Sequence, residues 1–253
     1  MPEKLAWNSV HLVKVIEGAR QVLLPPEASA GFFSASWFLL TNWGVLSMPD
    51  GQKLEDSLSP ELRARFVAAR GSIKRSKEHY DDKSPLVAGF LLESEYDEFN
   101  KLSGDEPGRT VEKIARAKHV KLRKIAHYDA MPPVKEILKL GPEQGWVCLA
   151  NAVSDVETRA AHAVPAAEAW AAGDIKPLKA HYSTSNLTTC AFQTKSFNTL
   201  FQRSVDDSLK AIHEALATPG KTVMLVDVGE LLRNAGVAEK LRAEGIVIEG
   251  PAE

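Results

Sequence analysis

The segment that decides the fold is Thr222-Val-Met-Leu-Val-Asp-Val-Gly-Glu-Leu-Leu-Arg-Asn-Ala-Gly-Val-Ala-Glu-Lys-Leu-Arg-Ala-Glu-Gly-Ile-Val-Ile-Glu249. Its first seven residues, 222–228, predict a buried strand, and the amphipathic pattern of residues 231–244 predicts a helix. Gly245 is expected to end that helix, and residues 246–249 predict a second short strand. A strand, a helix and a strand in this order indicate an α/β fold.

Two further short apolar runs predict strands of the same sheet. Gln21-Val-Leu-Leu-Pro25 is followed by a second proline, and prolines cannot donate hydrogen bonds to a strand ladder. Val120-Lys-Leu-Arg-Lys-Ile125 alternates apolar and basic residues, as expected of a strand with one face in water. We therefore expect a central sheet of a few short strands covered by helices.

The middle of the chain has helical patterns, roughly over residues 28–118 and 130–216. Ser59-Pro-Glu-Leu62 predicts a capped helix start. The longest apolar run, Phe32 to Met48, is interrupted by polar residues, so it predicts a buried helix and not a membrane span of about 20 apolar residues. No linker separates independent domains, and we expect one domain over residues 1–253.

The composition is that of an ordinary globular protein. At 253 residues, with 44% hydrophobic and 25% charged residues, the chain can bury a full core. The net charge of -2 produces no field that would attract nucleic acid or an anionic membrane. The N-terminus lacks the apolar segment of a signal peptide, so the sequence predicts a cytoplasmic protein, or a periplasmic or secreted one if a signal has been removed.

The two cysteines, Cys148 and Cys190, do not assign a compartment. They permit one disulfide or none. Buried free thiols are the simpler expectation, because cysteine is among the most buried residue types.

Three local motifs resemble known sites but lack what those sites need. Residues 215–222 fit a relaxed phosphate-loop pattern, yet a helix is expected before them and a strand after them, the reverse of a phosphate loop. His213-Glu-Ala-Leu-Ala217 lacks the second histidine of a zinc-binding helix. His127-Tyr-Asp129 follows a predicted strand, where functional groups often lie, but a hydrogen-bonding pair in a loop is the simpler interpretation. The other five histidines show no ligand spacing and are expected at the surface or in the core: His11, His79, His119, His162 and His181.

Several segments together resemble the TraB/PrgY/GumN family, which is related to the Tiki-type metalloproteases. Residues 222–249 are similar to the family's closing segment, in which a strand ends in V-G-x-G-H-L. Residues 169–178, Ala-Trp-Ala-Ala-Gly-Asp-Ile-Lys-Pro-Leu, are similar to its A-W-x-x-G-D-x-x-x-L motif, and residues 201–212 to its R-N-x-x-(W/M)-x-x-x-I helix. Residues 1–7 resemble the family segment that comes after its first motif, G-T-x-H-L, as if the chain began just beyond that motif.

The resemblance implies a site whose key residues are replaced here. In relatives, histidines of two G-x-x-H motifs are thought to hold a divalent ion that polarises a carbonyl and activates water. Glu230 stands at the second histidine's position and Asp227 at that of a motif glycine, and the sequence contains no G-x-x-H. Arg203 matches the family arginine, which could stabilise an oxyanion. The candidate catalytic residues are thus Arg203, Asp227 and Glu230, with the two carboxylates as weak candidates for metal ligands.

Two functions are compatible with this resemblance. The first is a divergent member that has lost metal-dependent hydrolysis and acts as a binding or regulatory protein for a peptide or protein ligand. The second is a metal-dependent, peptidase-like hydrolase that uses Asp227 and Glu230 with Arg203, with an N-terminal motif missing from this chain. We expect the first function and no bound cofactor, and we leave open a divalent metal and whether the chain is an enzyme. Neither a nucleic-acid partner nor a membrane span is expected.

Overall fold

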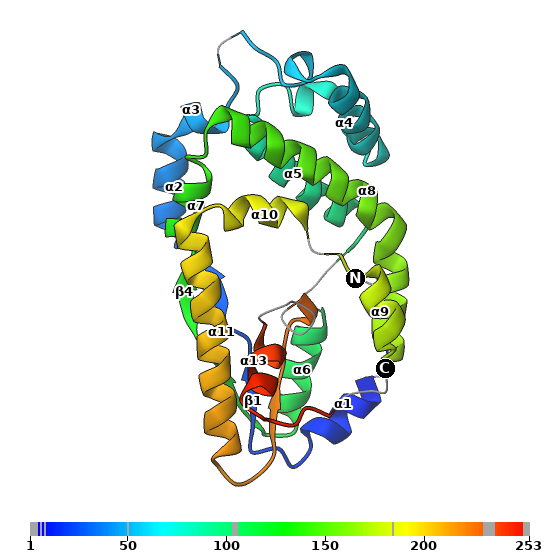
Figure 1. Ribbon diagram of the computed structural model, residues 1–253, viewed down its shortest axis with the longest axis vertical. Helices are drawn as coiled ribbons and strands as arrows, with labels where there is room; N and C mark the ends of the chain where they lie inside the picture. The colour runs from blue at the N-terminus through cyan, green and yellow to red at the C-terminus, as the bar shows by residue number, and fades with distance from the viewer. Residues whose placement is uncertain are drawn as a thin grey trace.

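The computed structural model describes residues 5, 7, 9–49, 51–102, 106–183, 185–229 and 236–249. It is mostly helical, with two small sets of parallel strands (Figure 1). The helices are α1 (Ser9–Ile16), α2 (Phe32–Thr41), α3 (Trp43–Leu46), α4 (Pro60–Ser72), α5 (Pro85–Phe99), α6 (Glu106–Ala117), α7 (Met131–Ile137), α8 (Pro142–Ala172), α9 (Ile175–His181), α10 (Asn186–Phe192), α11 (Lys195–Leu216) and α13 (Val237–Ala243). The strands are β1 (Gln21–Leu24), β2 (Glu27–Ser29), β3 (Lys121–Lys124), β4 (His127–Asp129) and β5 (Thr222–Met224).

The central sheet is parallel, with β1 between β3 and β5. Gln21 lies opposite Lys121 on one side and opposite Thr222 on the other. Three of the four predicted strands therefore form one sheet. Because all three run in the same direction, their carboxyl ends meet at one edge, where α/β proteins usually place functional groups.

The Pro25-Pro26 pair interrupts the first strand, because proline has no N–H to donate. Pairing resumes directly beyond the prolines, where β2 pairs with β4 and Glu27 lies opposite His127. The register of the first pair, Gln21 with Lys121, is kept across the break. Residues 127–129 were expected to lie in a loop after the predicted strand at residues 120–125. They form strand β4 instead, so that expectation is wrong.

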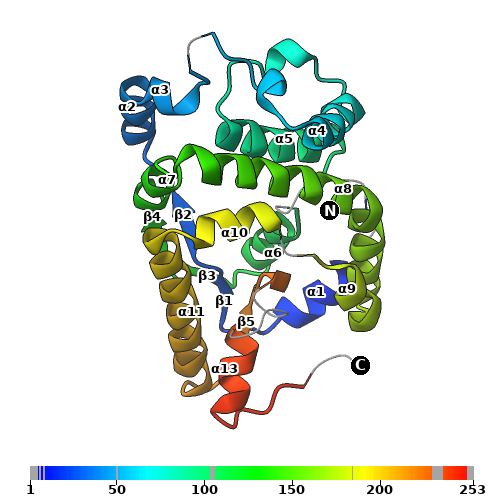
Figure 2. The same ribbon diagram turned by 45° about the horizontal axis from the view of Figure 1, so that its top comes forward.

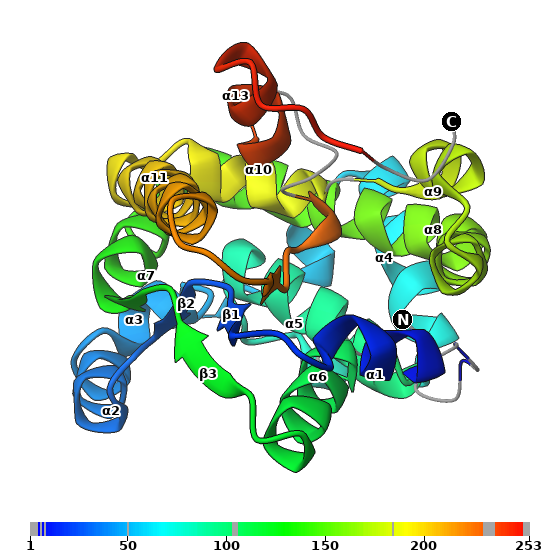
Figure 3. The ribbon, with the colours of Figure 1, turned by 90° about the horizontal axis from the view of Figure 1, so that it is seen from below.

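Helices cover both faces of the central sheet (Figure 3). On one face, α1 and α6 form a buried cluster with β1 that includes Ile16, Val22 and Val111. On the other face lies α11, whose Glu214 pairs with Arg123 of β3 at 3.3 Å. This arrangement confirms the expected α/β fold in which helices cover a sheet of short strands.

The helical middle is built around α8, which packs along α5. Their shared core includes Phe66, Tyr80 and Leu149, all wholly buried. In its second half α8 bends away from α5 (Figure 1), and Pro165 lies within the helix, where its missing N–H weakens the ladder. Gly173 ends α8 with φ +71°, a left-handed conformation that suits glycine, and α9 then packs back against α8.

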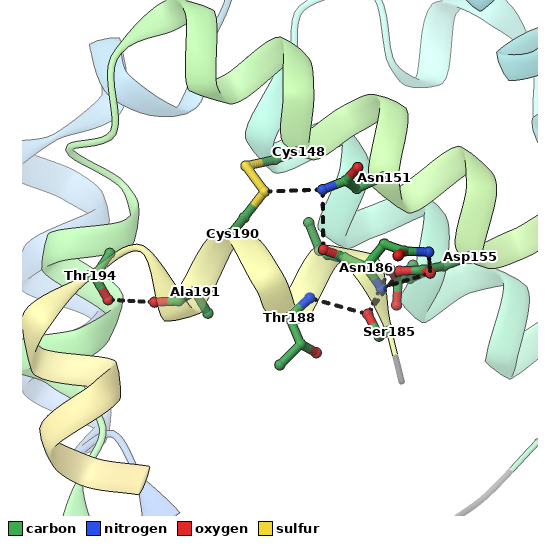
Figure 4. The surroundings of a disulfide bond; sticks show 11 residues. Cys148, Asn151, Asp155, Ser185, Asn186, Thr188, Cys190, Ala191 and Thr194 are labelled. Carbon is green, nitrogen blue, oxygen red and sulfur yellow. Dashed lines mark hydrogen bonds between the residues drawn. A yellow bond between two sulfur atoms is a disulfide. The ribbon is translucent and has the colours of Figure 1, made fainter. Parts of the chain in front are cut away.

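Helix α10 crosses beneath α8 (Figure 2) and is joined to it by a disulfide between Cys148 and Cys190 (Figure 4). The expectation of free thiols is therefore wrong. Both cysteines are wholly buried, as expected, but the packing of α8 on α10 brings their Cα atoms to 5.9 Å, within the usual disulfide range. A separation of 42 residues gave no local sign of this contact.

The predicted strand at residues 246–249 is wrong. These residues follow α13 without strand pairing, and Val247 is 84% exposed. The reason is that α13 packs on α11, through Val237 and Leu241 against Val205, so the chain leaves Gly245 beside helices and not beside β5. Gly245 itself has φ +82° and ends the helix as predicted.

Residues 32–48 were expected to form one buried helix, and this expectation is also wrong. The segment forms α2 and α3, and the side chains of Trp37, Leu40 and Trp43 are 64% to 75% exposed. The helix is interrupted at Asn42, between α2 and α3. Two short helices of this kind cannot bury one continuous face. In the described part of the chain, no helix is long and apolar enough to cross a membrane.

Candidate functional site

A cavity of about 760 Å³ lies at the carboxyl edge of the central sheet. Its sheet side is formed by Leu24 and Pro25 after β1 and by residues 225–228 after β5. Its helical side is formed by the second half of α8 and by α9, including Trp170 and Leu178. The volume falls within the range of about 300–1,000 Å³ that is typical of small-molecule sites.

Asp227 is exposed and lines this cavity directly before Val228 and Gly229, which are helical. Its Oδ1 accepts a hydrogen bond from the backbone N–H of Gly229 at 2.7 Å. A Cβ atom at Gly229 would overlap the Tyr182 hydroxyl and would lie 2.8 Å from Asp227 Oδ1. Any larger residue at this position would therefore force the side chains of Tyr182 and Asp227 to move.

Arg203 lies elsewhere. It is exposed on α11, and its guanidinium carbon sits 5.2 Å above the centre of the Tyr128 ring. The Tyr128 hydroxyl in turn donates to Asp207 at 2.6 Å. Among the described residues, the cavity is lined by Asp227 and not by Arg203, and Glu230 lies outside the described residues. The structure thus describes no contact between the three predicted site residues.

One wall of the cavity carries a charged network that the sequence did not indicate. Arg159 of α8 forms ion pairs with Glu93 and, at 3.1 Å, with Asp97 on α5. The hydroxyl of Ser185 donates to Asp155 at 2.8 Å and reaches Glu93 at 3.5 Å. Four of these residues, Asp97, Asp155, Arg159 and Ser185, line the cavity.

Burial raises the pKa of Glu93 to about 7, against the opposing charge of Arg159 and with a further rise from Asp155. Burial also acts to raise the pKa of Asp155, but the backbone amides of Leu187 and Asn186 outweigh it, so the net shift is downward. Near neutral pH, the buried pair therefore consists of an ionised Asp155 and a Glu93 that is part protonated.

Two histidines that were expected to be isolated meet in the same cavity. The Nδ1 atoms of His162 on α8 and His181 on α9 are 3.1 Å apart, and both rings line the cavity. The turn at Gly173 creates this contact, because it returns α9 along α8. Nineteen residues separate the two histidines, so no local spacing could have predicted the pair.

The local motifs behave as structural elements. His213 contacts Glu244 at 2.6 Å, and α11 ends at Leu216 before the strand that begins at Thr222, the reverse of a phosphate loop. Asp129 Oδ1 accepts from the N–H of Met131 and so supports the start of α7. Across the described residues, no three His, Cys, Asp or Glu side chains are arranged to hold a metal ion.

Comparison with known proteins identifies the family of the chain. The model of the TraB/PrgY/gumN family matches residues 1–250. No curated protein and no solved structure matches the chain. Since the family match covers nearly the whole chain, the protein belongs to the TraB/PrgY/gumN family.

Proposed function

We propose that this chain is a divergent family member that binds a short peptide or a peptide-like small molecule and has lost the metal-dependent hydrolysis proposed for relatives. The observation that carries this proposal is the cavity of about 760 Å³ at the carboxyl edge of the sheet. The family match over residues 1–250, together with packing of α8 on both α5 and α9, supports a single domain.

The lining of the cavity suits a ligand of mixed polarity. Trp170, Leu178 and Leu225 offer apolar surface for a side chain. The carboxylate of Asp227 can accept a hydrogen bond from a peptide N–H or an ammonium group. A site with a mainly apolar wall and a few fixed polar groups is the usual design of a small-molecule pocket.

The residues at the family's metal position do not fit a histidine-bound ion. Glutamate replaces the motif histidine at position 230, and Asp227 already accepts the Gly229 amide. Two carboxylates hold a divalent ion weakly unless further oxygen ligands converge on it. We therefore assign no step of catalysis to a metal bound by Asp227.

Binding can be tested with a pooled library of short peptides and thermal-shift detection. Ala166→Phe should fill the cavity, because Ala166 lines it, and should abolish every shift. Ala161→Phe, on the exposed face of the same helix, is the matched control and should keep the shifts. A ligand at 100 times its Kd stabilises the protein by about 2.7 kcal/mol, which a melting curve resolves. Equal shifts in both variants would place the ligand outside the cavity.

The alternative is a hydrolase that uses Asp227 and Glu230 with Arg203. The exposed carboxylate of Asp227 in the cavity is the observation that favours it. Incubation of the same library with Mn²⁺, Co²⁺ or Zn²⁺ should give no cleavage if binding is the function. Cleavage that disappears in both Asp227→Asn and Glu230→Gln would establish the hydrolase instead.

We also propose that the protein works in an oxidising compartment, as a periplasmic or secreted protein. The disulfide between Cys148 and Cys190 supports this, because such bonds are rare where thiols are kept reduced. Alkylation of the protein in its native cell, followed by mass measurement, should find no modified cysteine. Two alkylated thiols would point to a cytoplasmic protein.

A further inference from the structure

The contact between His162 and His181 differs from three other histidine contacts in the molecule. His79, His127 and His213 each contact a carboxylate, of Glu95, Glu27 and Glu244 respectively. His162 and His181 instead turn their Nδ1 atoms toward each other at 3.1 Å, with ring planes at 37°. A neutral pair can explain this distance only if one Nδ1 carries the proton and the other accepts it.

The same geometry fits two ligands of one metal ion. Nitrogen ligands lie about 2.0–2.1 Å from Zn²⁺, so two of them are about 2.9 Å apart at a right angle and about 3.4 Å apart at the tetrahedral angle. The observed 3.1 Å lies between these limits. Both tetrahedral Zn²⁺ and the square arrangements of Cu²⁺ and Ni²⁺ can therefore be accommodated.

The surroundings are those of an open site. Both imidazoles line the cavity and are only partly buried, so solvent or a bound ligand can supply the remaining coordination positions. The two rings come from neighbouring helices held together by the turn at Gly173, so they are positioned before any ion arrives. Cysteine does not compete for the ion, because Cys148 and Cys190 are joined in the disulfide.

We propose that His162 and His181 bind one divalent transition-metal ion in the wall of the cavity. Nitrogen-only protein ligands favour Cu²⁺ over Ni²⁺ and Zn²⁺, and these over Mn²⁺. The site needs neither Asp227 nor Glu230, so it differs from the position at which the resemblance placed a metal. It extends the proposed function, since an ion there would present its open positions to a ligand in the cavity.

The test uses the metal alone with the tag-free protein. Calorimetric titration with Cu²⁺, Ni²⁺ and Zn²⁺ should show one equivalent bound, with Cu²⁺ the tightest. The electron paramagnetic resonance spectrum of the copper-loaded wild type should show hyperfine splitting from two imidazole nitrogens. Because no peptide is present, failure here leaves the ligand-binding proposal untouched, and failure of peptide binding leaves this result unchanged.

Matched variants identify the ligands. His162→Gln and His181→Gln keep a hydrogen-bonding side chain but should each weaken Cu²⁺ binding by roughly tenfold or more, since even losing a partner of a ligand costs about 10–100-fold. His11→Gln, at an exposed histidine on α1, should bind like the wild type. Circular dichroism of each variant checks that it is folded. The electron paramagnetic resonance spectrum of the wild type tests the proposal even if a variant fails to fold.

Two results would overturn the proposal. One is the absence of a copper signal with two nitrogens in the wild type. The other is unchanged affinity in both folded glutamine variants. In either case the contact is an N–H···N hydrogen bond between helices, with no metal function.

Discussion

The buried carboxylate of Asp155 on α8 accepts a hydrogen bond from the backbone amide of Leu187, at 2.8 Å, in the first turn of α10. It also accepts from the backbone and the side-chain amide of Asn186, at 2.8 and 2.7 Å. The amides in the first turn of a helix have no partner within that helix. Asp155 therefore caps α10 from a neighbouring helix and fixes the segment that borders the cavity.

Replacing Asp155 with alanine should destabilise the protein by about 3 kcal/mol or more, because several charge-assisted hydrogen bonds are lost at a buried site. Urea unfolding monitored by circular dichroism measures the change. Asp174→Ala is the control, since Asp174 is exposed and does not cap α9 with its side chain. It should change stability by about 0.5 kcal/mol at most. Similar losses in both variants would contradict the capping role.

Glu93 should make stability depend on pH. Its pKa is raised by burial to about 7, whereas in the unfolded chain it takes the ordinary value of about 4.3. Between these values the folded protein holds a proton that the unfolded chain has lost. This contribution is therefore fully present below the unfolded pKa and is lost as the pH rises through about 7, with a total of at most about 4 kcal/mol.

The measurement is urea unfolding at pH 5 and pH 7.5. Wild type should lose stability relative to Glu93→Gln over this interval, because glutamine keeps the shape of the side chain and cannot ionise. Glu98→Gln, at an exposed position of the same helix, should retain the wild-type difference. A Glu93→Gln protein with the same pH dependence as wild type would refute the shifted pKa.

Removal of the disulfide should cost about 4 kcal/mol, the loop-entropy value for the 42 residues that separate Cys148 and Cys190. The Cys148→Ala/Cys190→Ala protein and the reduced wild type should melt at similar, lower temperatures. Reductant should have no effect on the double variant. Hydrogen exchange should show the largest loss of protection in α10, which the bond ties to α8. If reductant leaves the melting temperature of the wild type unchanged, the disulfide contributes nothing to stability.

Gly229→Ala should destabilise the protein by about 1–3 kcal/mol, because the added methyl overlaps the Tyr182 hydroxyl and the Asp227 carboxylate and forces them to move. Adding Tyr182→Phe removes that hydroxyl and should restore part of the loss. Gly71→Ala is the contrasting change, since Gly71 lies within α4 with open space around its would-be Cβ. It should stabilise the protein by about 0.5–1 kcal/mol. Equal effects of the two substitutions would argue against close packing around Gly229.

Local sequence patterns predicted much of the fold. The helical pattern expected over roughly residues 28–118 is present as several helices, α5 (Pro85–Phe99) among them. Ser59 was expected to cap a helix, and its hydroxyl accepts the Leu62 amide at 3.3 Å. The apolar runs of β1 and β3 signalled strands. The helices follow from interactions among residues close in sequence, and the strands are marked by local apolar runs although they pair with distant residues, which is why pattern reasoning found both.

The features that local sequence patterns did not predict depend on contacts between residues far apart in the chain. His162 meets His181 only after α9 folds back along α8, and Asp155 reaches Leu187 from a separate helix. The disulfide likewise requires α8 and α10 to pack together. Asp227, in contrast, was named because it stands in a motif, and it lines the cavity, while Arg203 rests on Tyr128. The family motif therefore identified the end of the strand that lines the cavity. Which other side chains lie near that strand end depends on tertiary packing, which the motif does not predict.

The central position of β1 in the sheet determines how long this strand lacks its partners during synthesis of the chain. Its two partners begin at Lys121 and Thr222, so the strand is translated long before either neighbour exists. At about 5–20 residues per second, a ribosome needs on the order of 10–40 s to make the roughly 200 residues between β1 and β5. Throughout that interval Val22 and Leu23, wholly covered in the finished protein, have an unpaired edge on the nascent chain. Slowing translation of the second half should therefore increase the demand for chaperones.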